Sequence, residues 1–278
     1  MVTSEQRRRQ LAREKYERQA QRRAEAHAAR RRRNTILGAS LAVVVLAGGG
    51  ALVGTGAFDS SDKKDSRNTA QAAPTATDEP TTPTRKPVEG CGEPAAGAPN
   101  GKQWPAEPAM SITATAGYTT TLDTNCGKVT LALDAAKAPH AVNSFAFLSG
   151  EQFFDHTKCH RLTTDGIFVL QCGDPTASAT NPGGTGGPGY KFADENLTGA
   201  TYPAGTVAMA NSGPGTNGSQ FFLVYKDTKL SPDYIPFGKI TGGLDVLQKI
   251  AAAGTLEGGP DGHPMADVTI NSATTVKG

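Results

Sequence analysis

Residues 159–174 read C-H-R-L-T-T-D-G-I-F-V-L-Q-C-G-D, and this stretch predicts a β-hairpin. Both halves are rich in β-branched and apolar residues, and Asp165-Gly166 between them is a signal for a two-residue type I′ turn. The two cysteines would then lie opposite each other where Cα atoms approach to about 4.5 Å, which allows a disulfide. Folding about this turn pairs Thr164 with Ile167, Arg161 with Leu170 and Cys159 with Cys172.

The chain after Met110 continues as short strands separated by turns, with only two helical patterns. Ala138-Pro139 opens the first helix, which ends at Gly150, and Leu244–Ala252 forms the second. Many short strands with two helices indicate a mainly β fold, a closed β-barrel capped by helices. The expected strands cover residues 111–115, 118–122, 128–133, 159–163, 167–172, 205–210, 220–225, 235–240 and 267–270.

A second segment, Met209–Phe222, reads M-A-N-S-G-P-G-T-N-G-S-Q-F-F and is typical of a pocket wall. Its glycines let the backbone approach a ligand, and its amides, among them Asn211 and Gln220, are suited to holding peptide groups. The paired phenylalanines would line an apolar hole. Composition alone leaves open an ordinary glycine turn that leads into a strand.

Together the two segments resemble the signature stretches of cyclophilins, the cyclosporin-binding class of peptidyl-prolyl cis–trans isomerases. The resemblance covers about residues 109–278 and implies an eight-stranded antiparallel β-barrel capped by two α-helices. It also implies proline-containing polypeptides as partners, no cofactor and no metal. Supporting stretches follow in the family's order: A-P-H-A-V-N-S-F at 138–145, G-T-G-G-P-G-Y-K-F-A-D-E-N at 184–196, P-F-G-K-I at 236–240 and D-V-T-I at 267–270.

The resemblance implies a site with two sets of residues. Rotation about an amide bond localises the lone pair of the nitrogen, so a catalyst needs an apolar seat for the proline ring and a donor to that nitrogen. A guanidinium keeps its proton and can be the donor. The catalytic set is Arg161, Phe168, Gln171 and Asn211. The substrate-binding set is Val169, Ala210, Gln220, Phe222, Leu230 and Tyr234.

Several positions depart from the family's usual pattern. The hairpin is two residues longer, Val169 stands where a methionine is usual, and Cys172 stands where a glycine is usual. Tyr234 replaces a histidine. Lys229 replaces the tryptophan linked to tight cyclosporin binding, so we expect weak cyclosporin binding.

The hairpin register conflicts with this site. An ideal hairpin places Gln171 on the face of His160, opposite to Arg161, whereas the family site requires Gln171 and Arg161 together. A β-bulge would reconcile the two. Without one, either the disulfide or the assignment of Gln171 is wrong.

The N-terminal part differs in composition from the rest. Residues 1–33 carry a net charge of +8, and the remainder carries −6. The basic character therefore belongs to a helical cytoplasmic tail, residues 1–34, and we expect no nucleic-acid-binding face. The tail would lie near anionic headgroups, with ribosome or RNA docking as an alternative.

Residues 35–58 contain no charge and no proline, and predict a transmembrane helix. At about 1.5 Å per residue they are long enough for a bilayer core of about 30 Å. The arginines before them place the N-terminus in the cytoplasm and everything after Phe58 outside. A cleaved signal peptide is the alternative, disfavoured by the long basic region.

Residues 59–108 predict an extracytoplasmic linker rich in Pro, Thr and Ala, with Cys91 and Trp104 to fasten its end. Four cysteines allow three pairings. We favour 159–172 and 91–126, because an extracytoplasmic location permits oxidation. A zinc site built on the hairpin cysteines and His160 is disfavoured, since adjacent strand residues point to opposite faces.

These observations predict a membrane-anchored isomerase of X-Pro bonds in exported or cell-surface proteins. The alternative is a non-catalytic proline-peptide binding or chaperone module tethered to the membrane. Arg161 favours the enzyme, because binding alone does not require a permanent cation at this position.

Overall fold

The computed structural model describes residues 83–278. The predicted basic tail and transmembrane helix, residues 1–34 and 35–58, lie outside the described residues. In the described part, neither helix is long and apolar enough to span a bilayer.

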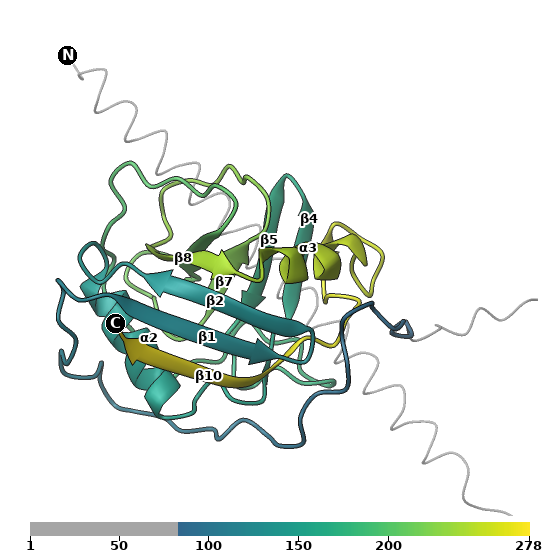
Figure 1. The fold of residues 1–278 in the computed structure, drawn as a ribbon, viewed down its shortest axis with the longest axis horizontal. Coiled ribbons are helices and arrows are strands. Elements are labelled where there is room, and N and C mark those ends of the chain that lie inside the picture. Colours follow the sequence, from purple (N-terminus) through teal and green to yellow (C-terminus); the bar gives the residue numbers. More distant parts are fainter. Residues whose placement is uncertain (1–82) are drawn as a thin grey trace, which may run out of the picture. The chain divides into compact units, whose positions relative to one another are not determined.

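Within residues 83–278, ten antiparallel strands form one curled sheet with two helices beside it (Figure 1). Neighbouring strands follow the order β3-β10-β1-β2-β8-β6-β7-β5-β4-β9. The helices are α2 (Pro139–Gly150) and α3 (Leu244–Ala252). The strands are β1 (Tyr118–Thr124), β2 (Gly127–Leu133), β3 (Thr157–Lys158), β4 (Arg161–Asp165), β5 (Ile167–Cys172), β6 (Thr206–Met209), β7 (Phe221–Val224), β8 (Pro236–Gly242), β9 (Asp261–Gly262) and β10 (Thr269–Lys277).

The sheet curls because two strands far apart in its order belong to one stretch of chain. Only Cys159 and His160 separate β3, which pairs with β10, from β4, which pairs with β5. The predicted closed barrel of eight strands is thus corrected to a curled sheet of ten. Two of the ten, β3 and β9, are only two residues long and leave no periodic pattern in the sequence.

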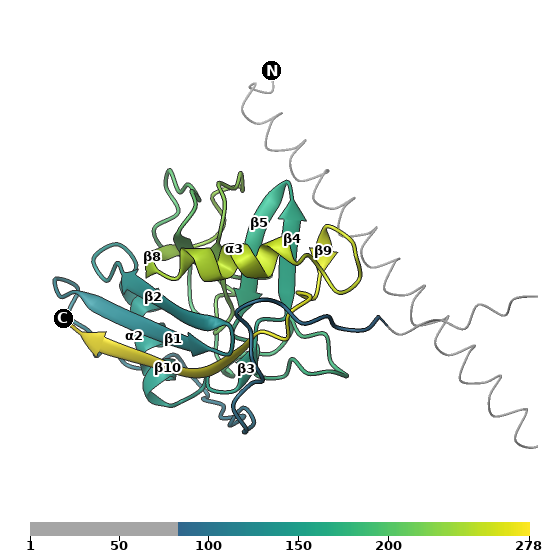
Figure 2. The same ribbon diagram turned by 45° about the vertical axis from the view of Figure 1, so that its right-hand side comes forward.

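The expected helices and the strand over 167–172 are confirmed. Pro139 lies in the first turn of α2, where its missing N–H costs no hydrogen bond. Gly243 precedes α3 with φ 82°, and a Cβ there would collide with the backbone of β2. α3 packs against β2 and β4, and the chain beyond it leads to β9 (Figure 2).

Most expected strands are shifted by one or two residues at their ends, and two differ more. Residues 111–115 form no strand, since Ala116 N donates to Thr113 O in a turn. The strand expected over 267–270 begins at 269 and continues to Lys277, because it pairs with the whole of β1. The mostly polar residues from Asn271 onward do not alternate with apolar ones, so the sequence does not indicate this extension.

The main core is built from aromatic rings of α2 and the sheet. Phe145 of α2 lies 4.8 Å from Phe154, 5.1 Å from Phe221 and 5.2 Å from Phe237, measured between ring centroids. All four rings are buried, and each buried phenylalanine contributes roughly 1.5–3 kcal/mol. This packing uses the inner face of the sheet and leaves the outer face of β5, β6 and β7 for a second, smaller apolar cluster.

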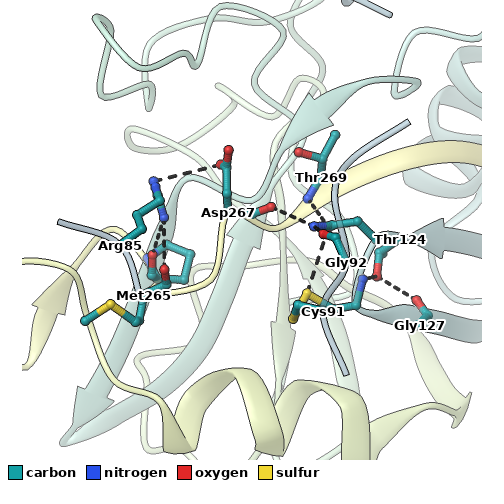
Figure 3. Close-up of a disulfide and its surroundings, with 11 residues drawn as sticks. Arg85, Cys91, Gly92, Thr124, Gly127, Met265, Asp267 and Thr269 are labelled. Carbon is teal, nitrogen blue, oxygen red and sulfur yellow. Dashed lines mark hydrogen bonds and ion pairs between the residues drawn. A yellow bond between two sulfur atoms is a disulfide. The ribbon is translucent and has the colours of Figure 1, made fainter. Parts of the chain in front are cut away.

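Residues 83–108, here called the strap, are attached to the domain at several points. A disulfide joins Cys91 to Cys126 in the turn between β1 and β2. Arg85 Nη1 donates to a backbone carbonyl of the loop before β10 at 2.7 Å, and Arg85 pairs with Asp267 at 3.9 Å. Figure 3 shows both attachments around Cys91.

Within the predicted linker over 59–108, the described residues 83–108 are held against the domain. Pro, Gly and Ala give no periodic pattern, so the sequence resembles a tether even where covalent and hydrogen bonds hold it. The expected fastening at Cys91 and Trp104 is confirmed, as are both favoured disulfides, 91–126 and 159–172.

Replacing Cys91 and Cys126 together by serine should lower the free energy of unfolding by about 3–4 kcal/mol. The closed loop spans a sequence separation of 35, and the chain-entropy account of disulfides gives this size for such a loop. Urea unfolding of residues 83–278 checks it, with the wild type under reductant as a comparison. An unchanged urea midpoint would contradict the prediction, because it would show that the disulfide adds no stability beyond that of the hydrogen bonds.

Candidate active site

Three predicted site residues form a row across neighbouring strands. Arg161 of β4 lies opposite Gln171 of β5, and Gln171 lies opposite Phe222 of β7. Residues directly opposite in antiparallel strands project from the same face, with strands about 4.8 Å apart. The outer face of the sheet therefore carries a cation, an amide and an aromatic ring side by side.

The hairpin that carries this row differs by one residue from the predicted register. Asp165 pairs with Ile167, which leaves Gly166 alone at the tip with φ 67°. Glycine tolerates this left-handed conformation. As a result Arg161 pairs with Gln171 and not with its neighbour on β5, so the predicted pairing of Arg161 with Leu170 is wrong.

A β-bulge at the base of the hairpin resolves the conflict between site and disulfide. His160 N donates to Gln171 O at 3.0 Å, while Arg161 is also the partner of Gln171. Two residues of one strand thus face one residue of the other. The disulfide between Cys159 and Cys172 forms beyond the bulge, and Gln171 still shares a face with Arg161.

The apolar side chains predicted to bind substrate come together beside this row. Val169 and Phe222 belong to the outer cluster, and Ala210, Leu230 and Tyr234 pack against it. The rings of Phe222 and Tyr234 meet edge to face at 5.5 Å, an arrangement that aromatic pairs favour. Five of the six substrate-binding residues therefore belong to one apolar cluster, in which Val169 and Phe222 are buried and the other three are partly exposed.

Phe168 is not brought to the site. Successive residues of a strand point to opposite faces, so Val169 projects outward and Phe168 does not. The ring of Phe168 lies 6.1 Å from that of Tyr225, and Lys226 Nζ stands 4.3 Å from its centroid. In this structure Phe168 therefore packs on the other side of β5, apart from the cluster around Phe222, and its catalytic role stays a prediction.

A chain of hydrogen bonds fixes the polar residues of the site. Arg161 Nη1 donates to Gln171 Oε1 at 3.2 Å, and Gln171 Nε2 donates to Gln220 Oε1 at 2.9 Å. Gln220 Nε2 then donates to the carbonyl of Gly186 at 2.9 Å. Each amide both accepts and donates, so its orientation is determined by its neighbours.

Asn211 lies farther along the same face and holds two loops together. Its Nδ2 donates to Asp233 O at 2.8 Å, and its Oδ1 accepts from Gly213 N at 3.2 Å. The first bond ties the residue to the loop that carries Tyr234. The predicted catalytic Asn211 therefore lies at the site with its amide engaged by protein groups.

Asp261 is a site residue that the sequence did not reveal. Its carboxylate accepts from Arg161 Nε at 2.8 Å and Nη2 at 2.7 Å, a bidentate pair. These bonds lower the pKa of Asp261, and they raise the pKa of Arg161. β9 places Asp261 opposite Thr163 of β4. Arg161 and Asp261 are 100 positions apart in the sequence. The only local pattern at Asp261 is an Asp-Gly pair, which is a turn signal.

The guanidinium keeps donors for a ligand. Of its five N–H groups, one on Nη1 and one on Nη2 have no hydrogen bond among the described residues. The Arg161 side chain is 42% exposed. It is therefore held in place from two sides and still open to solvent.

Beneath the row, Asp174 anchors the loop that carries Gly186. Burial alone would raise the pKa of Asp174, but hydrogen bonds from Thr176 and from Gly186 N outweigh it and lower the pKa. His160 is buried next to it, and that burial lowers the pKa of His160. His160 is therefore neutral near pH 7.

A groove of about 420 Å³ opens beside the apolar surface. Its lining includes Gln171, Gln220, Ala210 and Asn211, which come from both signature segments. The other side consists of the loop Gly184–Gly189. The groove is lined by both polar and apolar atoms, whereas the neighbouring cluster around Phe222 is apolar, so the two parts of the site differ in chemistry.

Comparison with known proteins agrees with this geometry. A family model described as "Cyclophilin type peptidyl-prolyl cis-trans isomerase/CLD" matches residues 119–275. The chain is 53% identical over 163 residues to "Probable peptidyl-prolyl cis-trans isomerase B" of Mycobacterium leprae (strain TN), covering 54% of each chain. It is 50% identical to the protein of the same name in Mycobacterium tuberculosis (strain CDC 1551 / Oshkosh), covering 54% of this chain and 51% of that one.

The chain thus spans about half the length of these curated relatives. A crystal structure of a cyclophilin type peptidyl-prolyl cis-trans isomerase from Cryptosporidium parvum aligns with a TM-score of 0.50 at 27% identity. That alignment covers 58% of this chain and 98% of the other. The family match includes every predicted site residue. The chain belongs to the cyclophilin-type peptidyl-prolyl cis–trans isomerase family.

Proposed function

We propose that this protein catalyses cis–trans isomerisation of X-Pro peptide bonds. The observation that carries the proposal is the fixed Arg161 guanidinium beside an apolar surface, in a chain of this family. The curated relatives at 53% and 50% identity bear the name of this activity. A module that only binds proline requires the apolar residues. It does not require a guanidinium that is fixed by both Gln171 and Asp261.

The mechanism follows from the electronic structure of the amide. Rotation about the C–N bond has a barrier of about 18–20 kcal/mol because the nitrogen lone pair is delocalised. In the twisted transition state the lone pair localises on nitrogen and becomes a better acceptor. An N–H of Arg161 aimed at that nitrogen stabilises the transition state more than either ground state, which is what accelerates the reaction.

Other residues position the substrate and the cation. The prolyl ring packs against Phe222, Leu230 and Tyr234, where its burial excludes water from the rotating bond. Gln171 and Asp261 hold the guanidinium, so that little reorganisation accompanies the reaction. Proline-containing polypeptides are thus the substrates. Cyclosporin would bind only weakly, in keeping with Lys229 in place of the tryptophan named above.

We also propose that the protein acts outside the cytoplasm while attached to the cell membrane. The uncharged run over 35–58 behind a basic tail supports a single-pass anchor with a cytoplasmic N-terminus. The two disulfides support an oxidising compartment, because cytosolic proteins rarely keep such bonds. Its substrates would be exported or cell-surface proteins.

Arg161→Ala should lower kcat/KM for a proline peptide by about 10²–10³, the usual cost of removing one transition-state donor. A protease-coupled isomerisation assay measures this. Lys128→Ala is a matched control, since Lys128 is an exposed cation that pairs only with Asp123 at 3.2 Å. If wild type and Arg161→Ala both run at the uncatalysed rate while the peptide still binds, the tethered binding or chaperone module is the correct function.

Asp261→Asn should lower kcat by about tenfold with little change in KM, because Asp261 positions Arg161 without touching substrate. The pKa of Asp261 lies below its ordinary value of 3.8. The ion pair between Asp261 and Arg161 is therefore intact at neutral pH. It is lost only as the pH falls through the lowered pKa of Asp261. Wild-type activity should have an acid limb there, and Asp261→Asn should lack it. Equal pH profiles would contradict the positioning role.

The full chain should sediment with membranes and resist alkaline carbonate, and deletion of residues 35–58 should release it. The physical reason is the burial of an uncharged run long enough for the bilayer core. Fractionation followed by N-terminal sequencing checks it. A soluble protein that begins after residue 58 would instead establish the cleaved signal peptide.

A further inference from the structure

The strap contributes a side chain to the groove beside the site. It lies outside residues 119–275, which the family model matches, and yet Gln103 lines the groove. Gln103 Nε2 donates to the carbonyl of Gly187 at 2.7 Å, and Trp104 N donates to the carbonyl of Pro188 at 2.9 Å. The strap thus holds the rim of the groove by two successive residues.

Contacts next to Gln103 fix the strap at this point. The ring of Trp104 lies 5.1 Å from that of Phe147 and 5.9 Å from that of Phe153. Lys102 Nζ pairs with Glu151 at 2.8 Å. An aromatic contact and an ion pair on either side of one residue leave Gln103 little freedom to move away from the groove.

The rim itself is shaped to receive the strap. Gly189 has φ 90°, and a Cβ there would stand 2.7 Å from the carbonyl oxygen of Trp104. A larger residue at this position would therefore both strain the backbone and push the strap away. The glycine allows the close approach that brings Gln103 to the groove.

The opposite wall of the groove consists of site residues. Gln220 donates to Gly186, so the rim loop is held from the site on one side and from the strap on the other. Ala210 borders both the apolar cluster and the groove. A polypeptide with its proline against Phe222 therefore has its neighbouring residues over the groove. The volume of the groove, about 420 Å³, lies within the range of ligand pockets.

We propose that the strap is the outer wall of the substrate groove and that Gln103 is a specificity-determining residue for the side chains next to the substrate proline. The proposal rests on the proposed function, since it concerns the same substrates. Of the described residues that line the groove, Lys191 is the only charged one. The groove therefore selects amide or acidic side chains over basic ones.

Charge substitutions at Gln103 in the full chain test this. The substrates are proline peptides that carry Glu, Gln or Lys at the positions flanking the X-Pro bond, together with a minimal peptide that has no such residues. Wild type should prefer Glu and Gln peptides to Lys peptides. Gln103→Lys should raise the Glu-to-Lys ratio of kcat/KM by about 3–10-fold, and Gln103→Glu should lower it by a similar factor.

The minimal peptide has no flanking side chain to place over the groove, so its turnover shows whether each variant is folded and active. Ala98→Lys and Ala98→Glu are matched controls, because Ala98 is exposed on the same strap and does not line the groove. They should leave the ratio unchanged. Gln103 variants with the wild-type ratio and full activity on the minimal peptide would overturn the proposal.

Failure of the catalytic function remains distinguishable from failure of this proposal. If wild type is inactive on every peptide, fluorescence anisotropy can measure the dissociation constants of the same peptides. The ratio of the dissociation constants for the Glu and Lys peptides then replaces the ratio of kcat/KM. A charge-dependent shift in binding at Gln103, absent at Ala98, supports the groove wall even without catalysis. Equal dissociation constants for all variants reject it.

Discussion

The site depends on one backbone irregularity, the bulge that lets His160 and Arg161 share Gln171. In a regular ladder a one-residue shift moves every side chain of a strand to the other face. The bulge confines this shift to the base of the hairpin. On the hairpin side of the bulge, Arg161 points to the outer face of the sheet. On the other side, Cys159 points into the core and bonds to Cys172. The disulfide and the cation therefore coexist only because the register changes between them.

From this point a continuous set of polar contacts spans the site. Asp261 and Gln171 hold the guanidinium, Gln220 follows, and the loop at Gly186 and Gly187 connects Gln220 to the strap. Such contacts orient donors before substrate arrives, which is the main requirement for stabilising a charge shift in a transition state. The apolar cluster next to them is positioned by packing, as in the contact of Phe222 with Tyr234, and by hydrogen bonds between the hydroxyl of Tyr202 and the backbone of Tyr234.

Local patterns predicted the elements whose information lies in neighbouring residues, such as α3 and β5. They could not predict Asp261, because a two-residue strand 100 positions away has no period to detect. The face on which Phe168 lies follows from strand alternation, which a family resemblance does not give. The Pro/Gly-rich strap looked like a linker because its attachments involve residues distant in sequence.

The strap serves two physical roles that act in different states of the protein. Its disulfide at Cys91 restricts the unfolded chain, so it contributes to stability whatever the substrate. Its contact at Gln103 exists only in the folded protein and faces the groove. Trp104 packs against Phe147 of α2, a contact separate from the disulfide at Cys91. Stability and specificity are therefore separable: loss of the disulfide weakens the fold, while the groove wall persists for as long as the domain remains folded.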